Sequence, residues 1–325
     1  MIIPILGVNI MSKNTKIIGL TILIAVILLL IFTLYAMSGD NTETVKIGYL
    51  PTDHDAALFV ANATGMFKDA GIEVELYEYN NGGDMMSAMA SGELDVGYVG
   101  ITPVIYSISK GVPVKIVAGT QNEGSGLLAH SSSVKSITDL KGKTIATPGE
   151  ASIQSVLLKY DLKKHGLSTS DIESPTMKVS SMNDALKTDG IDAMLTYEPY
   201  VTISKNINNQ TLVENSSDIL PDHPCCVVIM NEKFLSKESD KSKKILDIHK
   251  RATEKIIENP EGAIQYLPPH IVPDSEIEKE SLKHIQWVSD LNDTYKKNVN
   301  DFLNIEKDLG IINGDIPQEK LFSDI

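Results

Sequence analysis

The segment Gly82–Gly119 constrains the fold more than any other part of the chain, because it alternates between helical and strand patterns. Methionines within 85–89 give its first part an apolar face at helical spacing, and the apolar run 96–99 is typical of a short buried strand. A second helical stretch and a strand over 114–118 follow, with glycine or small polar residues at each junction. This alternation predicts a parallel sheet with helices on both faces.

The junctions of this segment favour ligand binding. Asp84 is the expected N-cap of the first helix, and Thr102 followed by Pro103 is the favoured start of the second. Open α/β sheets hold ligands at the carboxyl ends of their strands, where helix N-termini present free backbone N–H groups. Since no nucleophile, base or group of metal ligands stands there, the segment predicts binding of a small molecule and not its transformation.

The alternation extends over residues 45–230 and divides at the polar, glycine-bearing stretch 121–125, which we interpret as a crossing between two lobes. In the second lobe, the turn 147–152 and the pair Glu198 and Pro199 again join a strand end to a helix start. Residues 233–325 are almost wholly helical in pattern. We expect strands over 45–50, 72–79, 96–99, 114–118, 126–130, 143–146, 177–179, 191–195, 211–214 and 225–230.

The uncharged apolar run Ile17–Met37 has about the length that a bilayer requires. Lysines precede it and acidic residues follow it, which predicts a cytoplasmic N-terminus over 1–16, a membrane anchor over 17–37 and a linker over 38–44. The rest of the chain is then expected at the extracytoplasmic face of the cell membrane. Cleavage of the run as a signal, with secretion of the protein, is the alternative, and Met11 is an alternative start.

Composition excludes some partners. The formal net charge is −14, which argues against binding to nucleic acid. Arg251 is the only arginine, so the bidentate clamp that proteins use for carboxylate, sulfonate or phosphate has almost no source. The only cysteines, Cys225 and Cys226, are adjacent and cannot cross-link distant parts of the fold. They are expected as small buried apolar residues on a strand, with a vicinal disulfide or a thiol facing the cleft as alternatives.

Several short motifs, in their order and spacing, resemble those of the substrate-binding proteins of ABC importers, and within them the nitrate, sulfonate and taurine family. The resemblance spans about residues 45–234. It is carried by IGYLP (47–51), GMF (65–67), GELDVG (92–97), GVPV (111–114), DLKGKTI (139–145), IDA (191–193) and EPY (198–200).

The resemblance implies an α/β fold of two doubly wound lobes joined by two hinge crossings, the type II periplasmic-binding-protein architecture. Lobe 1 would comprise residues 45–122 and 226–325, and lobe 2 residues 123–225. It implies a monomer that is not an enzyme, needs no cofactor or metal, and captures a small solute outside the membrane. A permease and an ATPase of an ABC importer would be its partners.

Carried onto this chain, the ligand positions of the family lie at strand ends and helix starts of both lobes. They are Thr52, Asp53, His54, Gly83, Asp84, Gly100, Ile101, Thr102, Glu150, Ala151, Ser152, Tyr197 and Glu198. Family members that bind nitrate or sulfonate often have basic or neutral polar groups where this chain has four carboxylates, those of Asp53, Asp84, Glu150 and Glu198. Carboxylates facing the cleft would favour a cationic or zwitterionic solute over a bare anion. In the alternative interpretation, Asp53 and Asp84 are helix caps that face solvent.

Histidines leave a second function open. His54, between two aspartates, is interpreted as a polar ligand contact or a helix-start residue, with a metal ligand or proton-transfer group as the alternative. His223 stands beside Cys225 and Cys226. A relative of this fold in the synthesis of the thiamine pyrimidine uses histidine and cysteine in an enzyme. The alternative to a nitrate- or sulfonate-type binding protein is therefore a pyrimidine or thiamine-precursor binding protein or synthase.

Overall fold

The structure is a computed structural model that describes residues 22–28, 44–130, 134–272 and 274–325. Residues 44–325 form one compact unit, and residues 22–28 lie outside it. Of the predicted anchor over 17–37, residues 22–28 are helical, and the remainder lies outside the described residues together with the predicted N-terminus over 1–16 and nearly all of the linker. Among the described helices, none combines the length and the apolarity needed to cross a bilayer.

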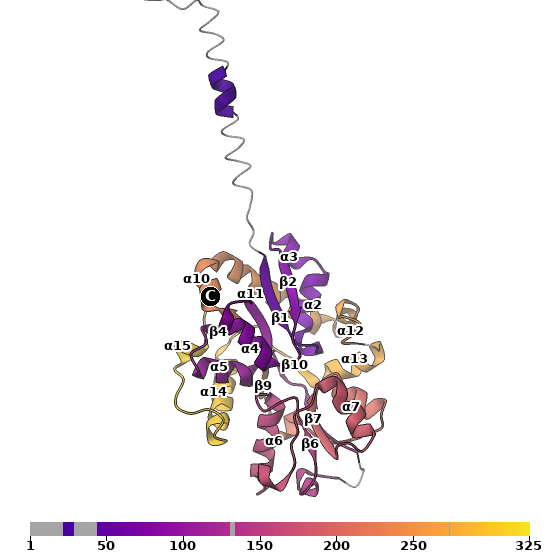
Figure 1. Cartoon of the computed structure of the whole chain (residues 1–325). Coiled ribbons are helices and arrows are strands. Elements are labelled where there is room, and N and C mark those ends of the chain that lie inside the picture. Colours follow the sequence, from indigo (N-terminus) through magenta and orange to yellow (C-terminus); the bar gives the residue numbers. More distant parts are fainter. Residues whose placement is uncertain (1–21, 29–43, 131–133, 273) are drawn as a thin grey trace, which may run out of the picture. The chain divides into compact units, whose positions relative to one another are not determined.

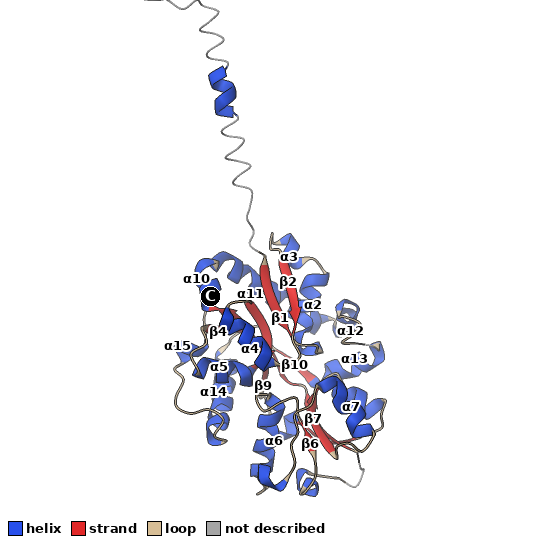
Figure 2. Ribbon diagram, viewed as in Figure 1, coloured by secondary structure: helices blue, strands red, loops and turns tan. Residues whose placement is uncertain are grey.

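Two β-sheets organise the unit 44–325 into two lobes, each with helices packed against its sheet (Figures 1 and 2). The sheet of lobe 1 has the strand order β10-β4-β9-β3-β1-β2, and the sheet of lobe 2 has the order β6-β7-β5-β8. The strands are β1 Val45–Tyr49, β2 Val74–Glu78, β3 Val96–Gly100, β4 Val114–Glu123, β5 Ser125–Ala129, β6 Ile145–Ala146, β7 Ala193–Tyr197, β8 Thr211–Asn215, β9 Pro224–Asn231 and β10 Ile285–Trp287.

Helices connect these strands and cover the sheets, as the alternating pattern predicts. The described helices are α2 Ala56–Ala63, α3 Met66–Asp69, α4 Gly82–Ser91, α5 Ile101–Ser109, α6 Ile153–Lys164, α7 Val179–Lys187, α8 Tyr200–Asn206, α9 Ser216–Ile219, α10 Glu232–Lys237, α11 Ser239–Glu258, α12 Pro260–Ala263, α13 Ser275–Ser281, α14 Asp293–Asp308 and α15 Gln318–Leu321. Short 3-10 helices include η1 Asp53–Asp55 and η5 Leu282–His284.

The prediction of a parallel sheet in lobe 1 is correct only in part. β1 pairs in parallel with β2 and with β3, but β9 lies antiparallel between β3 and β4. β9 enters the sheet after the chain has built lobe 2, so a pattern read along consecutive residues cannot locate it. Lobe 2 likewise contains an antiparallel strand, β5, between β7 and β8.

Two connections join the lobes. The first is Gly124, which links β4 of lobe 1 directly to β5 of lobe 2, and its φ of +79° is a conformation that glycine adopts without strain. The second runs from α9 of lobe 2 to β9 of lobe 1. Because both connections are short, the strand ends that flank them stay close together at the boundary between the lobes.

Several local predictions are wrong. Helix α4 begins at Gly82 with Asn81 as its N-cap, so Asp84 lies in its first turn, and α5 begins at Ile101 after Gly100. Residues 177–179 form no strand, since the neighbouring Thr176 makes a single bridge to Thr147 and α7 begins at Val179. To the C-terminal region, predicted as almost wholly helical, the structure adds the short strand β10, which pairs with β4.

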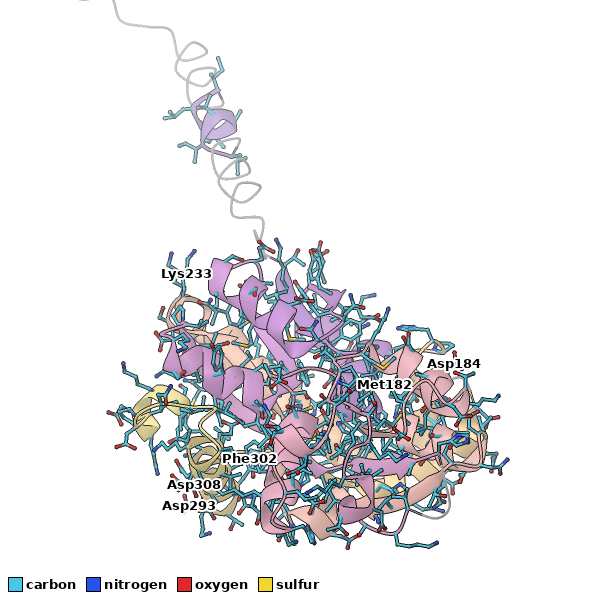
Figure 3. The ribbon with its side chains drawn as sticks, turned by 60° about the horizontal axis from the view of Figure 1, so that its bottom comes forward. Met182, Asp184, Lys233, Asp293, Phe302 and Asp308 are labelled. Carbon is cyan, nitrogen blue, oxygen red and sulfur yellow. The ribbon has the colours of Figure 1, made fainter. Side chains whose placement is uncertain are left out.

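Helix α14 shows how the C-terminal region completes lobe 1. Phe302 is buried in the core, whereas Asp293 and Asp308 at the two ends of the helix are exposed (Figure 3). Glu306 is also fully buried, and neither of its carboxylate oxygens has a hydrogen-bond partner among the described residues. Burial raises the pKa of Glu306 to about 8, so the core holds this side chain protonated at neutral pH.

Replacing Glu306 by glutamine is expected to flatten the pH dependence of stability. The folded-state pKa of Glu306 lies above its unfolded value, so its contribution is present at acid pH and is lost as pH rises toward 8. The wild-type free energy of unfolding should therefore fall, relative to Glu306→Gln, by about 3 kcal/mol between pH 5 and 8. Urea denaturation at several pH values measures this difference, and parallel curves for the two proteins would contradict it.

Candidate functional site

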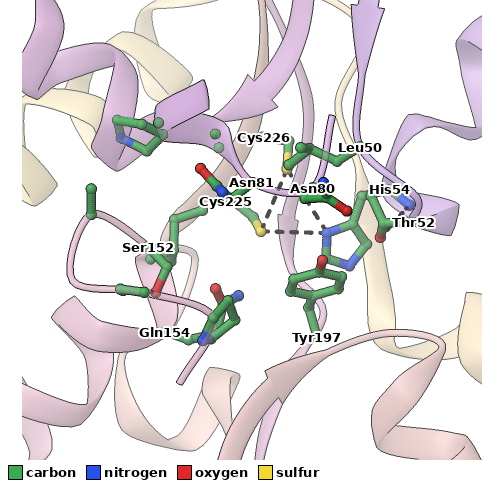
Figure 4. Close-up of a pocket in the computed structure, with 18 of the residues that line it drawn as sticks. Leu50, Thr52, His54, Asn80, Asn81, Ser152, Gln154, Tyr197, Cys225 and Cys226 are labelled. Atoms are coloured by element: carbon green, nitrogen blue, oxygen red, sulfur yellow. Dashed lines mark hydrogen bonds between the residues drawn. The ribbon is translucent and has the colours of Figure 1, made fainter. Parts of the chain in front are cut away.

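A cavity of about 290 Å³ lies where strand ends and helix starts of both lobes meet (Figure 4). Its size is at the lower end of the range for small-molecule sites. Among the described residues that line it there is no lysine or arginine, and Glu150 supplies the only carboxylate. The lining residues are Leu50, Thr52, His54, Asn80, Asn81, Gly82, Gly83, Gly100, Pro103, Pro148, Gly149, Glu150, Ala151, Ser152, Ile153, Gln154, Thr176, Tyr197, Cys225 and Cys226.

Two helix N-termini, one from each lobe, border the cavity. In lobe 1, Asn81 caps α4, and its Oδ1 accepts a hydrogen bond of 2.9 Å from the backbone N–H of Asp84. In lobe 2, the Oγ of Ser152 caps α6 by accepting from the N–H of Ser155 at 3.1 Å. Both helix ends direct partial positive charge toward the cavity. Gly82 permits the close approach of α4 to α5, because a Cβ there would lie 2.6 Å from the Pro103 side chain.

His54 and the two cysteines form a buried cluster at the wall of the cavity. The Nδ1 atom of His54 lies 3.5 Å from the Sγ of Cys225 and 3.9 Å from the Sγ of Cys226 (Figure 4). The two sulfur atoms are 3.9 Å apart and are free thiols. Of the alternatives open for these cysteines, the structure contains a thiol at the cleft and no vicinal disulfide.

Electrostatics within the cluster favour a charged pair. Burial opposes protonation of His54, but the neighbouring Cys225 thiolate outweighs it and raises the His54 pKa to about 9. The hydrogen bond from Cys226 holds the pKa of Cys225 well below its usual value, with His54 adding to the effect. The pKa of Cys226 is raised by that same hydrogen bond and by burial. Within the cluster, Cys225 is thus the thiol that favours the thiolate form.

Aromatic and amide side chains shape the rest of the cavity. The buried ring of Tyr197, at the end of β7, lies 5.8 Å from the His54 ring, measured between centroids. Gln154 in α6 is buried, and its Nε2 donates to the Oγ of Ser125 at 2.9 Å. Figure 4 shows Gln154 and Tyr197 on the lobe 2 side, opposite Asn80 and Asn81 of lobe 1. The cavity thus offers a flat apolar surface and several neutral amides.

Three of the four carboxylates that the sequence suggested for the cleft do not line it. Asp84 is exposed and accepts a hydrogen bond from the Asn81 amide at 2.8 Å. Asp53 and Glu198 are buried outside the lining, where Asp53 accepts from Ser281 and Glu198 from Thr202 and His284. Partners on α8 and the C-terminal region hold these two carboxylates away from the cavity.

Glu150 is the carboxylate that does line the cavity. It is exposed and pairs with Lys159 at 2.5 Å, which compensates its charge. The expectation of four inward carboxylates is therefore wrong, and so is the alternative for Asp53 as a solvent-facing cap, since Asp53 is fully buried. Burial raises the pKa of Asp53 to about 6.

Of the predicted ligand positions, the structure brings eight to the cavity: Thr52, His54, Gly83, Gly100, Glu150, Ala151, Ser152 and Tyr197. Asp53, Asp84, Ile101, Thr102 and Glu198 lie outside the lining, and Ile101 and Thr102 are buried within α5. Sequence reasoning missed Asn80, Asn81 and Gln154, and it kept a cysteine thiol at the cleft only as an alternative. Asn81 carried a usable signal, because asparagine is among the best N-cap residues and it precedes two glycines.

The chain is similar in sequence to a binding protein and to an enzyme. It is 26% identical over 230 residues, 70% of each chain, to a candidate binding protein of Brucella abortus. It is 26% identical over 239 residues, 69% of each chain, to the 4-amino-5-hydroxymethyl-2-methylpyrimidine phosphate synthase THI11 of Saccharomyces cerevisiae.

Solved structures share the fold. A zinc-bound ligand-binding component of an ABC-type import system from Staphylococcus aureus matches with a TM-score of 0.77 and 20% identity, covering 86% of this chain and 96% of that one. The periplasmic aliphatic sulphonate-binding protein of Escherichia coli matches with a TM-score of 0.73 and 17% identity, covering 86% and 97%. These likenesses confirm the periplasmic-binding-protein-like α/β fold. Residues 38–265 match the profile of the NMT1-like family, and the chain belongs to that family.

Proposed function

We propose that this protein is the solute-binding component of an ABC import system. The observation that carries the proposal is the cavity between the lobes, which receives residues from both and is bordered by the N-termini of α4 and α6. Lobe 1 (45–122 and 226–325) and lobe 2 (123–225) would close on the solute about the two short connections. The family and the likeness to an import-system component support this proposal.

The proposal includes the cellular setting. The run 17–37 would hold the protein at the extracytoplasmic face of the membrane, or direct its secretion if it is cleaved. A permease and an ATPase of the importer would receive the solute. The protein would act as a monomer without a nucleic-acid partner, as its net charge of −14 favours.

The lining supports a small uncharged or zwitterionic solute over a bare anion. Nitrate or a sulfonate would find no lysine or arginine among the described lining residues and would depend on helix N-termini and amides. A flat, polar heterocycle fits better, because Tyr197 offers a ring to pack against and Asn80, Asn81 and Gln154 offer neutral hydrogen-bonding groups. The size of about 290 Å³ restricts the solute to a compact molecule.

A panel of solutes tests the function directly. The full chain in mild detergent should be stabilised against heat by one class among pyrimidines, amino-sulfonates, sulfonates, nitrate and bicarbonate, with a shift that grows with concentration above the Kd. Tyr197→Ala should weaken binding at least ~10-fold, because it removes a ring that buries apolar area of the solute. The exposed Tyr106→Ala, on α5 outside the cavity lining, is the matched control. No stabilisation by any class would contradict the proposal.

The buried His54 and Cys225 pair favours a second candidate function, an enzyme that transforms a pyrimidine or thiamine precursor. The 26% identity to the yeast pyrimidine phosphate synthase supports it. The two candidates differ in the fate of the ligand. Mass spectrometry of the pool before and after incubation should recover an unchanged solute from a binding protein, whereas a new product would identify an enzyme.

A further inference from the structure

The cluster of His54, Cys225 and Cys226 has the dimensions of a metal site. A tetrahedral zinc ion with Zn–S of about 2.3 Å and Zn–N of about 2.05 Å places two sulfur ligands about 3.8 Å apart and a sulfur and a nitrogen about 3.6 Å apart. The observed separations are 3.9 Å between the sulfurs, and 3.5 and 3.9 Å from the Nδ1 of His54 to each sulfur. An ion could bind all three atoms with shifts of a few tenths of an ångström.

We propose that His54, Cys225 and Cys226 form a site for a thiophilic metal ion, Zn²⁺ or Cu⁺, whose remaining coordination position opens into the cavity. Thiolate and imidazole select such ions over Mg²⁺ or Ca²⁺. All three residues line the cavity, so a fourth ligand can approach from that side, as a water or as a bound solute. Two cysteines, one histidine and an open position is an arrangement found in catalytic zinc sites.

The protein holds the three ligands in place before any ion binds. Cys226 is in the centre of the lobe 1 sheet, where it is paired with Gly100 of β3 and Gln121 of β4. The His54 ring is packed against the backbone at Gly124, because a Cβ built there would lie 2.6 Å from Nε2. Such rigid placement reduces the entropy that metal binding costs.

The environment of His54 also fits a metal ligand. Nε2 is buried with no hydrogen-bond partner among the described residues, and the Oδ1 of Asp53 lies 3.9 Å away. A histidine that binds a metal through Nδ1 carries its proton on Nε2, and proteins commonly direct that N–H at a carboxylate. One divalent ion with two thiolates and a neutral imidazole has no net charge, which suits a site whose ligands are all under 5% exposed.

Cobalt titration tests the site, because Co²⁺ in a tetrahedral thiolate site gives charge-transfer absorption that free Co²⁺ lacks. The chain contains only two cysteines, so this absorption can arise only from Cys225 and Cys226. One equivalent of Co²⁺ added to the full chain, reduced with a non-thiol reductant, should produce the band, and Zn²⁺ should abolish it. Absence of the band at one equivalent would overturn the proposal.

Substitutions distinguish a metal site built from all three residues from metal binding by the two thiols alone. Loss of an outer-shell partner already weakens metal binding roughly 10- to 100-fold, so Cys225→Ser and Cys226→Ser should each weaken Co²⁺ binding by at least that much. His54→Gln retains both thiols and should shift the Kd by a similar factor, whereas an unchanged Kd would exclude His54 as a ligand. His223→Gln is the matched control, because His223 is buried nearby and its Nδ1 bonds to the Leu220 carbonyl. The titration needs no solute, so its outcome is independent of the proposed transport function.

Discussion

Replacing Gly124 by alanine is expected to destabilise the protein by roughly 2–4 kcal/mol and to distort the cavity. A side chain at this φ of +79° costs about 1 kcal/mol. The added Cβ would also lie 2.6 Å from the Nε2 of His54, and forcing an atom into a packed site costs roughly 1–3 kcal/mol more. The His54 ring would have to leave the wall of the cavity, so solute affinity should fall with stability.

Gly142→Ala is the matched control for this substitution. Gly142 has nearly the same φ, +76°, but a Cβ there would have no neighbour within 4 Å. Gly142→Ala should therefore lower the free energy of unfolding by about 1 kcal/mol, from the backbone conformation alone. Urea denaturation measures both variants, and equal losses would show that contact with His54 contributes nothing.

Removing the carboxylate of Glu198 should lower the free energy of unfolding by roughly 3–5 kcal/mol, because it leaves its hydrogen-bond donors without an acceptor. Glu198 is 1% exposed. It accepts hydrogen bonds from the N–H and hydroxyl of Thr202 at 3.0 Å each, and from the Nδ1 of His284 at 2.6 Å. Glu198→Ala therefore removes the hydrogen bond that joins Glu198 of lobe 2 to His284 of the C-terminal region. The free energy of unfolding of the variant, measured in urea, checks this value.

A second acidic residue near His284 provides the comparison. Glu280 lies 3.9 Å from the Nε2 of His284 and is partly exposed, so Glu280→Ala should lower the free energy of unfolding by under about 1 kcal/mol. The hydrogen bond to Glu198 raises the pKa of His284. The stability that His284 contributes is then full below its unfolded pKa of about 6.5 and is lost as pH rises through the folded value. Glu198→Ala should remove this pH dependence, and an unchanged pH profile would contradict the pairing.

Local patterns located most elements but not the groups whose positions depend on distant partners. The glycine junctions and apolar runs predicted β1, β3 and α6 closely, because helix and strand periodicity is a property of consecutive residues. The burial of Asp53 could not be predicted, since Ser281 on α13 provides its hydroxyl partner. The antiparallel insertion of β9 follows from pairing across the whole of lobe 2 and leaves no mark in its own sequence.

The cysteine pair shows the same limit at the site. Adjacent residues of a regular strand face opposite sides of a sheet, so a strand pattern alone does not predict two thiols at one cleft. Both line the cavity because they stand at the start of β9, where the chain enters the sheet from lobe 2. The direction of a side chain at such an entry point depends on the path of the preceding connection, which composition and periodicity do not specify.

The position of β9 also determines the order in which the two lobes can be completed. The strands of lobe 2 lie in one continuous stretch of the chain. In lobe 1, β3 and β4 pair with β9, which is synthesised after lobe 2. Until β9 is synthesised and pairs, β3 and β4 each have an unpaired edge, and such edges promote aggregation or binding by chaperones. Lobe 1 begins first along the chain but is thus the last to fold completely. A nascent chain that ends before Asn231 cannot complete its sheet.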